Sequence, residues 1–473
     1  MVGGLNEECG VFGIWSAEQR EVAHDVYLGL YALQHRGQES CGIAICDDGL
    51  ISCEKGEGLV SEHFDREKLS KLSQGSMAVG HVRYSTCGNN NINNIQPLVI
   101  RHIKGNMALV HNGDLVNAAR LRKSFELTGA IFHGSSDTEA IAYAIVRERL
   151  TCSSTEEAVA AAMPSLKGAY SCIAMTATKL IAFRDPNGFR PLCIGKKKNG
   201  DIVIASESCA LEAVGAEFLR DIEPGEIVTV GGHGISSVRT GAGRRSDICI
   251  FEYIYFARPD SVIEGVSVHH ARLRAGEILA KSCPADADIV IGVPDSGLDA
   301  ALGFSKESGI PYGIGFLKNK YIGRSFIQPV QSEREDAVRI KLNVIKETVA
   351  GKRVVMIDDS IVRGTTSARI VRLLREAGAA QVHVRITAPP FRHSCYFGTD
   401  IDDEGSLIAN KYSDISEIAA HIGADSLGFL PAESLGELCG REEGWCEGCF
   451  TGVYPVDVSE AGMKNKFDER IHK

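Results

Sequence analysis

The chain has 473 residues, enough for one to three domains with well-filled cores, and 44% of them are hydrophobic. Its 51 basic and 61 acidic residues give a net charge of −10, which argues against general binding to nucleic acid or to a membrane surface. No apolar run approaches the roughly 18 residues of a membrane span, and the acidic N-terminus does not resemble a secretory signal, so we expect a cytoplasmic protein. The 15 scattered cysteines are expected to be reduced thiols, metal ligands or a nucleophile.

The first half of the chain alternates short strands with Gly and Asn turns. Strands are predicted at 11–14, 43–46, 52–55, 77–83, 107–111, 171–176, 180–184, 192–194 and 202–206. Helices are predicted at 21–34, 117–128, 138–148 and 155–164. Runs of strands with grouped helices indicate a layered α+β domain. The Gly-rich segment 231–245 is interpreted as a linker.

The second half changes to strand–helix alternation. Strands are predicted at 288–293, 353–357 and 381–387, and helices at 298–308 and 367–377. This order is typical of an α/β domain whose parallel sheet is covered by helices on both faces. The Gly- and Cys-rich segment 433–455 is expected to be a tail rather than a core element.

Cys9 stands at the start of the first predicted strand, where a buried cysteine is usually inert packing. A catalytic role would require removal of residues 1–8, because Cys9 would then carry a free α-amino group beside its thiol. That amine, with a pKa of about 8, can accept the proton of the thiol and so activate the nucleophile.

The most informative stretch is an apolar strand that ends in Asp358 and Asp359 and leads through a loop of hydroxyls into a helix. Ligands of open α/β sheets bind at the carboxyl ends of strands, and a helix N-terminus there favours an anion. Carboxylates beside a phosphate suit sugar hydroxyls or Mg²⁺. The Walker lysine is absent, and an Asp pair that only caps a turn is the alternative. The predicted phosphate site comprises Asp358, Asp359, Ser360, Arg363, Gly364, Thr365, Thr366 and Ser367.

This stretch resembles the phosphoribosyl-diphosphate (PRPP) loop of type I phosphoribosyltransferases. The resemblance implies that the acidic pair binds the ribose hydroxyls and that the loop cradles the 5-phosphate. A second match, residues 294–297, stands where the family binds pyrophosphate and Mg²⁺, so Mg²⁺ is expected at Ser296, Asp358 and Asp359. The basic segment 318–327 reads as a solvated loop, but by resemblance it closes over PRPP. The implied diphosphate contacts are Lys318, Lys320, Arg324 and Lys341.

Four motifs in the first half each have an ordinary explanation as a turn or a helix cap. They lie at 35–38, 80–86, 111–114 and 135–139. Together with Cys9, and in this order, they resemble the class II glutamine amidotransferase domain, which has an N-terminal-nucleophile (αββα layered) fold. The resemblance implies that Cys9 attacks the glutamine amide and that Asn112 and Gly113 form the oxyanion hole.

The same resemblance assigns the glutamine pocket. It implies that Arg83 binds the α-carboxylate of glutamine and Asp137 its α-ammonium group. Arg36 and Gly37 would help to close the pocket.

Cys446 and Cys449 form a C-x-x-C motif near the end of the chain, which alone is a weak metal signal. Cys249, Cys395 and Cys439 are possible further ligands, and spacing does not separate zinc from an iron–sulfur cluster. Glutamine–PRPP amidotransferases with a cleaved N-terminal extension carry a [4Fe–4S] cluster. Resemblance to them implies Cys249, Cys395, Cys446 and Cys449 as its ligands, with a structural role.

Both halves match in order, so the chain is identified as a member of the glutamine–PRPP amidotransferase family. This implies a propeptide (1–8), a glutaminase domain (9–235), a phosphoribosyltransferase domain (236–440) and a ligand-bearing tail (441–473). The implied reaction transfers ammonia from glutamine to PRPP and yields 5-phosphoribosylamine, glutamate and diphosphate, the first committed step of purine synthesis. Feedback inhibition by purine nucleotides and a homotetramer or homodimer are implied as well.

Two alternatives to this reaction have their own sequence marks. Other class II amidotransferases carry a sugar-isomerase half or a Ser-Gly-Gly-x-Asp-Ser loop, and this sequence has neither. The second alternative is a non-enzymatic PRPP sensor. Such a protein would not need the amide site, so the presence of Cys9 and its accompanying motifs argues against it.

Overall fold

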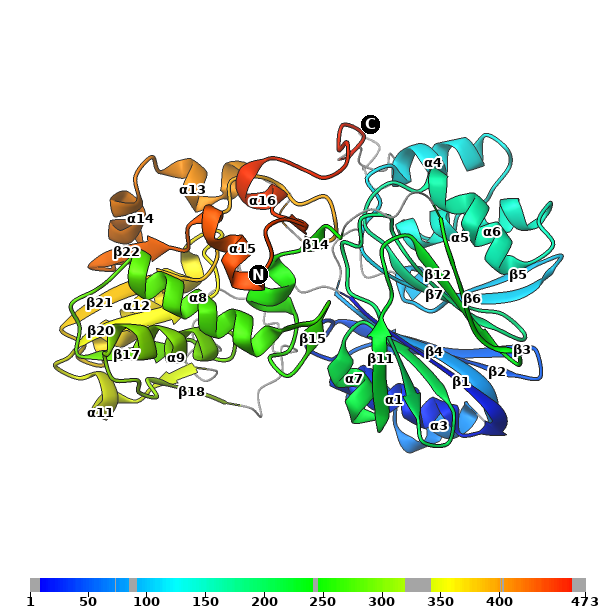
Figure 1. Ribbon diagram of the computed structural model, residues 1–473, viewed down its shortest axis with the longest axis horizontal. Helices are drawn as coiled ribbons and strands as arrows, with labels where there is room; N and C mark the ends of the chain where they lie inside the picture. Colours follow the sequence, from blue (N-terminus) through cyan, green and yellow to red (C-terminus); the bar gives the residue numbers. More distant parts are fainter. Residues whose placement is uncertain are drawn as a thin grey trace, which may run out of the picture.

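The computed structural model describes residues 9–72, 74–84, 92–240, 246–319, 342–399, 401 and 404–461. Two lobes lie side by side, the first running from blue to green and the second from green to red (Figure 1). The predicted propeptide 1–8 and three predicted diphosphate contacts, Lys320, Arg324 and Lys341, lie outside the described residues. Among the helices described, none is long and apolar enough to cross a membrane.

The first lobe contains two antiparallel sheets packed face to face. One has the order β11-β9-β10-β1-β4-β2-β3 and the other β13-β12-β8-β7-β6-β5. Val11 and Val79 from one sheet pack against Val110 and Ile173 from the other, so alternate residues of each strand form the core. The strands are β1 (Gly10–Arg20), β2 (Ser40–Asp47), β3 (Leu50–Glu57), β4 (Gly75–Arg83), β5 (Leu98–His102), β6 (Gly105–Asn112), β7 (Ser171–Met175), β8 (Leu180–Arg184), β9 (Cys193–Lys197), β10 (Ile202–Ala205), β11 (Ala216–Asp221), β12 (Glu226–Gly231) and β13 (Gly234–Arg239).

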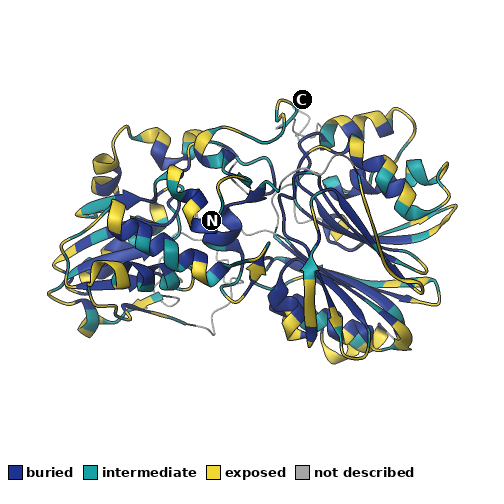
Figure 2. Cartoon of the chain, viewed as in Figure 1, coloured by how far each residue is buried: buried dark blue, intermediate teal, exposed yellow. Residues whose placement is uncertain are grey.

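Helices cover the outer faces of both sheets. The first sheet is covered mainly by α1 (Val22–Ala32) and α7 (Ser208–Ala213), with α2 (Val60–His63) and α3 (Arg66–Lys71) nearby. The second is covered by α4 (Ala118–Glu126), α5 (Asp137–Arg149) and α6 (Thr155–Ala162). Figure 2 shows the buried residues concentrated along the sheets, with exposed residues on the outer helices. The predicted αββα layering is therefore confirmed.

The second lobe is built on a parallel sheet of order β17-β20-β21-β22. Two of its strands, β17 and β20, are nearly continuous apolar runs, which is the pattern of strands covered by helices on both faces. They are β17 (Ile289–Gly292), β20 (Arg353–Asp358), β21 (Gln381–Ile386) and β22 (Ser426–Phe429). The covering helices are α8 (Val268–Ser282), α9 (Gly297–Ser308), α12 (Thr365–Glu376) and α14 (Ile415–Ile422). The predicted α/β domain is confirmed.

Shorter elements complete the two lobes. The short strands are β14 (Ile248–Cys249), β15 (Val262–Ile263), β16 (Val266–Ser267), β18 (Phe316–Lys318), β19 (Leu342–Val344) and β23 (Trp445–Cys446). The short helices are η1 (Ile92–Asn94), η2 (Met163–Ser165), the π-helix η3 (Glu252–Phe256), α11 (Lys346–Val349), η4 (Glu404–Ser406), α13 (Ile408–Lys411), η5 (Ala432–Ser434), α15 (Leu435–Cys439) and α16 (Gly448–Thr451).

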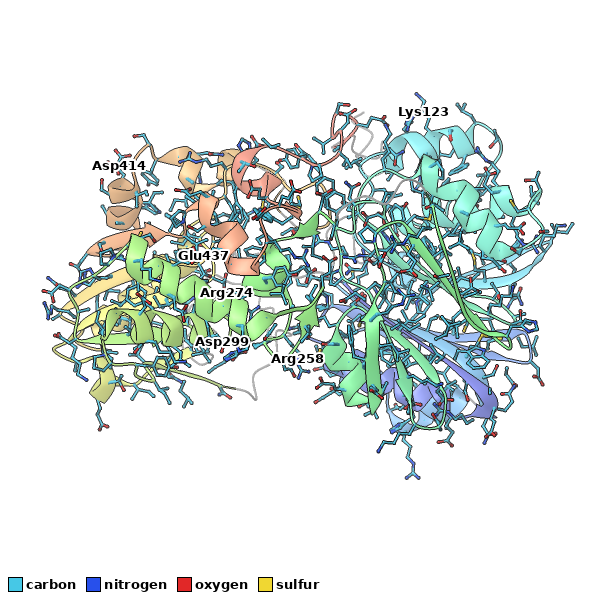
Figure 3. The ribbon with its side chains drawn as sticks, viewed as in Figure 1. Lys123, Arg258, Arg274, Asp299, Asp414 and Glu437 are labelled. Atoms are coloured by element: carbon cyan, nitrogen blue, oxygen red, sulfur yellow. The ribbon has the colours of Figure 1, made fainter. Side chains whose placement is uncertain are left out.

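Two expectations need correction. The predicted linker contains β13, which pairs with β12 through the whole of its length, so the first lobe extends past residue 235 to Arg239. The predicted tail is not peripheral, because α15 packs on α8 and Arg274 Nε donates to the Leu438 carbonyl at 2.9 Å. Figure 3 shows Arg274 and Glu437 on these neighbouring helices. The sequence did not predict α15, because the glycines and acidic residues around its apolar residues are typical of a loop.

Candidate functional site

Cys9 lies at the edge of the first lobe where β1 begins and β4 ends. Gly10 pairs with Val82, and the Cys9 thiol faces the Tyr84 carbonyl at 3.8 Å. His81 Nε2 donates to the His111 carbonyl at 3.0 Å, which brings the carboxyl ends of β4 and β6 together. The residues predicted for glutamine chemistry on these strands therefore converge on one edge of the sandwich.

Asn112 is the last residue of β6, and Gly113 begins the tight loop that follows. Asn112 is 1% exposed, and its Nδ2 is buried without an acceptor among the described residues. Gly113 has φ of +133°, and a Cβ there would lie 2.2 Å from the Ala169 carbonyl oxygen, so only glycine fits. A buried amide without a partner is costly unless a ligand or water completes it.

The predicted pocket residues surround this loop. A Cβ on Gly37 would lie 2.5 Å from the Arg83 nitrogen, so the backbone at Gly37 packs directly against the end of β4. Asp137 begins α5, accepts from the Leu115 N–H at 3.0 Å and lies 3.5 Å from His111 Nδ1. Burial alone would raise the pKa of Asp137, but His111 and these hydrogen bonds outweigh it and lower the pKa. A buried carboxylate kept ionised suits a cationic ligand.

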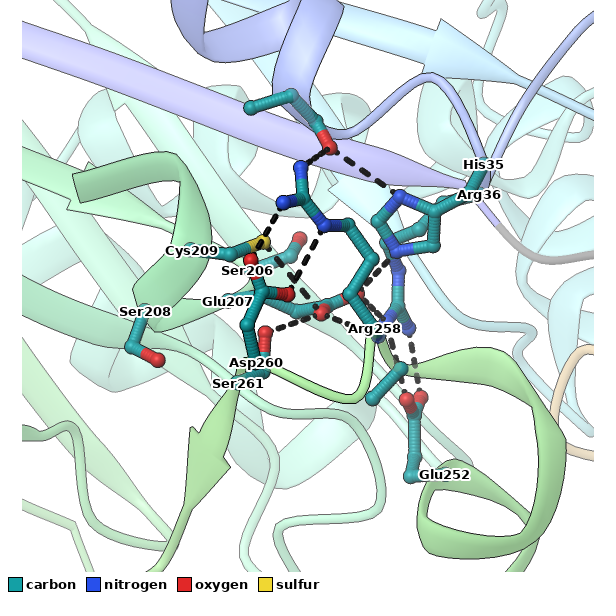
Figure 4. Close-up of polar contacts among 12 residues, drawn as sticks. His35, Arg36, Ser206, Glu207, Ser208, Cys209, Glu252, Arg258, Asp260 and Ser261 are labelled. Carbon is teal, nitrogen blue, oxygen red and sulfur yellow. Dashed lines mark hydrogen bonds and ion pairs between the residues drawn. The ribbon is translucent and has the colours of Figure 1, made fainter. Parts of the chain in front are cut away.

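The Arg36 side chain has partners that the sequence did not reveal. Its Nε donates to the Cys9 carbonyl at 3.2 Å, and its Nη atoms bind Glu207 at 2.6 Å and Glu252 at 2.7 Å. Figure 4 shows the guanidinium group directed at these carboxylates. The side chain therefore holds the main chain of Cys9 in place, and its guanidinium group is committed to these partners.

The predicted phosphate site lies at the carboxyl ends of β17 and β20. Val293 N donates to the Ile357 carbonyl at 2.8 Å, which places the loop after β17 beside Asp359. Ser296 and Ser360 each donate a hydroxyl to Asp359 at 2.5 Å. Ser296 and the acidic pair, predicted from separate motifs, are thus brought together.

Burial governs the charge of this acidic pair. It raises the pKa of Asp358 well above its usual value, with the neighbouring Asp359 adding to the effect, and it raises the pKa of Asp359 too. Two buried carboxylates side by side need a cation or a proton, so they fit a Mg²⁺ ion or ligand hydroxyls.

The loop that follows enters α12 through Gly364. Gly364 has φ of +80°, and a Cβ there would meet Ile408 at 2.4 Å. Ser367 is buried, whereas Arg363 and Thr365 are exposed and Thr366 is half-buried. Lys318, at the end of β18, forms an ion pair with Asp295 in the loop after β17. Of the four predicted diphosphate contacts, Lys318 is the one among the described residues.

Four cysteines far apart in the sequence line one cavity between the lobes. Cys249 and Cys446 are paired in the parallel ladder of β14 and β23, and Cys395 and Cys449 complete the lining with aromatic rings. Cys439 lies elsewhere, with its thiol directed at the Leu435 carbonyl in α15.

The four sulfurs surround a common space rather than a point. Within the described residues, no three His, Cys, Asp or Glu side chains stand close enough together to share a single metal ion. Burial raises the pKa of Cys446 to about 12 and that of Cys449 well above its usual value. Ionised thiols here need a cationic centre, so the cavity fits a metal cluster held by four thiolates.

Comparisons with known proteins decide the family. Residues 81–213 match the glutamine amidotransferase domain model and residues 267–407 the phosphoribosyl transferase domain model. The chain is 48% identical to the amidophosphoribosyltransferase of Bacillus subtilis, over 96% of this chain and 95% of that one. It is 49% identical to the amidophosphoribosyltransferase of Methanocaldococcus jannaschii, over 95% and 98% of the two chains. The chain belongs to the amidophosphoribosyltransferase family.

Solved structures agree with this membership. The B. subtilis glutamine PRPP amidotransferase complexed with ADP and GMP has a TM-score of 0.88 at 47% identity, covering 95% of this chain and 98% of that one. Amidophosphoribosyltransferase activity forms 5-phosphoribosylamine from glutamine and PRPP, and this chain thus carries out the first step of purine biosynthesis.

Sequence reasoning missed the residues that support the amide site. Gln96 binds both the N–H and the carbonyl of His111, at 2.6 and 3.3 Å, and so fixes the end of β6. Glu252 stands in the aromatic run 251–256, where a lone carboxylate signals a buried charge that needs a partner. That signal was present, but it did not name Arg36 as the partner.

Proposed function

We propose that Cys9, freed as the N-terminal residue, is the nucleophile that hydrolyses glutamine. The observation that carries this role is the buried Asn112 Nδ2 beside Gly113, which has no acceptor among the described residues and lies at the edge where Cys9 precedes β1. Attack of the thiolate on the amide carbon creates an oxyanion, and donors already in place stabilise it without reorganisation. Arg83 and Asp137 hold the α-carboxylate and the α-ammonium of the substrate.

Proton transfers close the cycle. The Cys9 α-amine takes the thiol proton and returns it to the leaving nitrogen as the C–N bond breaks, which releases ammonia and leaves a thioester. Water then attacks the thioester, the C–S bond breaks, glutamate is released and the Cys9 thiol is regenerated. With residues 1–8 in place the Cys9 nitrogen is an amide and cannot act as this base, so we propose that 1–8 is a removable propeptide.

Two assays test this assignment. Cys9→Ala is expected to abolish glutamine-dependent diphosphate release from PRPP while ammonia-dependent release continues, because the second lobe is untouched. Glutamine-dependent turnover that persists in this variant contradicts the assignment. Intact-mass measurement shows whether the active chain begins at Cys9, and an active chain that retains residues 1–8 contradicts the propeptide.

We propose that the second lobe binds PRPP at the carboxyl ends of β17 and β20. Asp358 and Asp359 bind the ribose hydroxyls, and segment 360–367 binds the 5-phosphate through its N–H groups and hydroxyls. Ser296 and the acidic pair would hold Mg²⁺, which neutralises the diphosphate leaving group. Ammonia forms a bond to C1, the C1–O bond to diphosphate breaks, and the new amine loses a proton. The domains are then 9–240 and 241–440, with 441–473 carrying cluster ligands.

We propose that Cys249, Cys395, Cys446 and Cys449 hold a [4Fe–4S] cluster with a structural role. Four thiols around a common cavity support a cluster rather than a single zinc ion, whose sulfur ligands all lie about 2.3 Å from one centre. When bound, the cluster ties β14, segment 391–399 and α16 together. Iron content and visible absorbance of anaerobically purified protein test this, and zinc in place of iron refutes it.

We propose that purine nucleotides inhibit this enzyme, since the similar B. subtilis protein was solved with ADP and GMP bound. A cytoplasmic homodimer or homotetramer is the proposed assembly. Inhibition assays with ADP and GMP test the first point and light scattering the second. Turnover unaffected by saturating nucleotide contradicts the regulatory proposal, and a monomer at assay concentration contradicts the assembly.

A further inference from the structure

A buried charge cluster joins the two lobes directly behind Cys9. Arg36 from the first lobe is fully buried and binds two fully buried carboxylates. Glu207 belongs to the first lobe, at the start of α7, and Glu252 belongs to the second, at the start of η3. Burying three charges is favourable only where the partners are held in good geometry, so each carboxylate constrains the position of the guanidinium.

Arg36 passes this constraint to the nucleophile. Its Nε donates to the Cys9 carbonyl at 3.2 Å, while its Nη1 and Nη2 take both oxygens of Glu252 at 3.0 and 2.7 Å. The guanidinium group is planar and rigid, so the two Nη atoms that bind Glu252 also fix the direction in which Nε points (Figure 4). One carboxylate of the second lobe thereby fixes a backbone atom of Cys9.

The other carboxylate is already held from several sides. Glu207 accepts from the Ser261 hydroxyl at 2.6 Å and the Arg258 N–H at 2.9 Å, and it contacts His35 Nε2 at 2.7 Å. Burial would raise its pKa, but His35 and Arg36 outweigh it and lower the pKa well below its usual value. Glu207 is thus an ionised anchor that remains when Glu252 is altered.

Glu252 is itself held by the second lobe. Its carbonyl accepts from the Ala257 N–H at 3.0 Å, which closes the π-helix. The buried Arg272 of α8 donates to the carbonyls of Tyr253, Tyr255 and Ala257 at 2.7 to 3.0 Å. Burial raises the pKa of Asp359, and the charge of Arg272 partly opposes that rise, so Arg272 lies within electrostatic reach of the proposed PRPP site. Segment 252–257 is therefore a fixed platform between the two sites.

We propose that Glu252 is a positioning residue for the glutaminase reaction: it orients Cys9 through Arg36, so that the phosphoribosyl lobe holds the nucleophile of the other lobe in its productive geometry. The inference rests on the proposed role of Cys9. Its consequence is that glutamine hydrolysis depends on correct docking of the second lobe.

A second interlobe carboxylate provides a matched control. Glu264 of the second lobe binds Arg184 of the first at 2.7 Å, and both side chains are largely buried. Its other ion pair is with Arg441 at 2.7 Å, and neither of these arginines belongs to the Arg36 cluster. Glu252→Gln and Glu264→Gln therefore make the same chemical change across the same junction, and the first alone removes a charge that holds Arg36.

The test compares both variants in the full-length mature enzyme. For Glu252→Gln we expect kcat for glutamine hydrolysis to fall on the order of 100-fold, as for a misplaced reacting group. The KM for glutamine should stay unchanged, because Arg83 and Asp137 are untouched, and ammonia-dependent turnover should be retained. Glu264→Gln should leave all three quantities unchanged. Glu252→Asp, which keeps the charge but shortens the side chain, should show a smaller loss of kcat.

Several results would overturn the inference. Unchanged glutamine hydrolysis in Glu252→Gln, a parallel fall in ammonia-dependent turnover, or an equal loss in Glu264→Gln would each show that Glu252 serves folding or docking alone. If Glu252→Gln does not fold, full activity of Glu252→Asp overturns the inference in the same way. Cys9→Ala separates this failure from that of the proposed function, because a Cys9→Ala enzyme that still turns over glutamine refutes the nucleophile itself.

Discussion

Truncation of Asn112 to alanine removes one of the two proposed oxyanion donors. In the free protein Asn112 Nδ2 is buried and has no acceptor among the described residues, so the substitution breaks no protein hydrogen bond at that atom. Loss of one such donor in an acyl-transfer site lowers kcat about 10²–10³-fold, or about 3–4 kcal/mol of transition-state stabilisation. The free energy of unfolding should change by no more than about 1 kcal/mol, because removing an unsatisfied buried amide offsets the lost packing.

Asn117 offers a matched control in the same lobe. It is fully buried like Asn112, but its Nδ2 donates to the Ser165 carbonyl at 2.9 Å and its Oδ1 accepts from the Lys167 N–H at 3.1 Å. Asn117→Ala removes two partly buried hydrogen bonds to the main chain and should cost about 1–3 kcal/mol of stability, at about 0.5–1.5 kcal/mol for each bond. Its effect on kcat for glutamine should be small.

Steady-state glutamine hydrolysis and urea unfolding measure the two quantities side by side. We expect the Asn112 variant to lose turnover and keep its stability, and the Asn117 variant to do the opposite. An Asn112→Ala enzyme with normal kcat, or one whose lost activity follows a lost fold, would refute the oxyanion assignment.

Three further predictions concern single residues. Gly37→Ala should cost about 1–3 kcal/mol of stability and raise the KM for glutamine, because its Cβ would lie 2.5 Å from the Arg83 nitrogen; an unchanged KM contradicts the pocket assignment. Burial, with Arg83 adding, lowers the pKa of His81 to about 3, so His81 stays neutral in the fold but takes up a proton on unfolding below about pH 6.5. The contribution of neutral His81 to the free energy of unfolding is then present above pH 6.5 and is lost as pH falls towards 3, by about 2 kcal/mol between pH 6.5 and 5. In urea unfolding, His81→Gln should lack this loss. A variant whose stability depends on pH as the wild type does would refute the prediction. Burial raises the pKa of Asp358, and metal binding needs its carboxylate in the ionised form, so the KM for PRPP should fall as pH rises. Asp358→Asn should bind PRPP weakly, and its KM should depend less on pH. A wild-type KM for PRPP that is independent of pH argues against the site.

The sequence by itself determined what depends on near neighbours in the chain. Periodicity predicted the layered first lobe and the parallel sheet, because strand and helix patterns repeat over a few residues. The loop after Asp359 predicted a phosphate site, since strand, loop and helix N-terminus are consecutive. Resemblance brought Cys9, Arg83, Asn112 and Asp137 together as one site, although no local pattern links them.

Tertiary structure alone decided what depends on distant residues. Arg36 and Glu252 are 216 residues apart, and no repeat or spacing in the chain predicts their ion pair. Burial, which sequence does not reveal for a single residue, left Asn112 Nδ2 without an acceptor among the residues described, whereas close cationic partners kept the buried Glu207 ionised. The β13 strand was not predicted, because it lies in a Gly-rich segment without a strand pattern. It is stabilised by its hydrogen-bonded pairing with β12, which the local sequence does not indicate. Local patterns specify elements, and the free energy of burying charged groups is settled only when those elements pack.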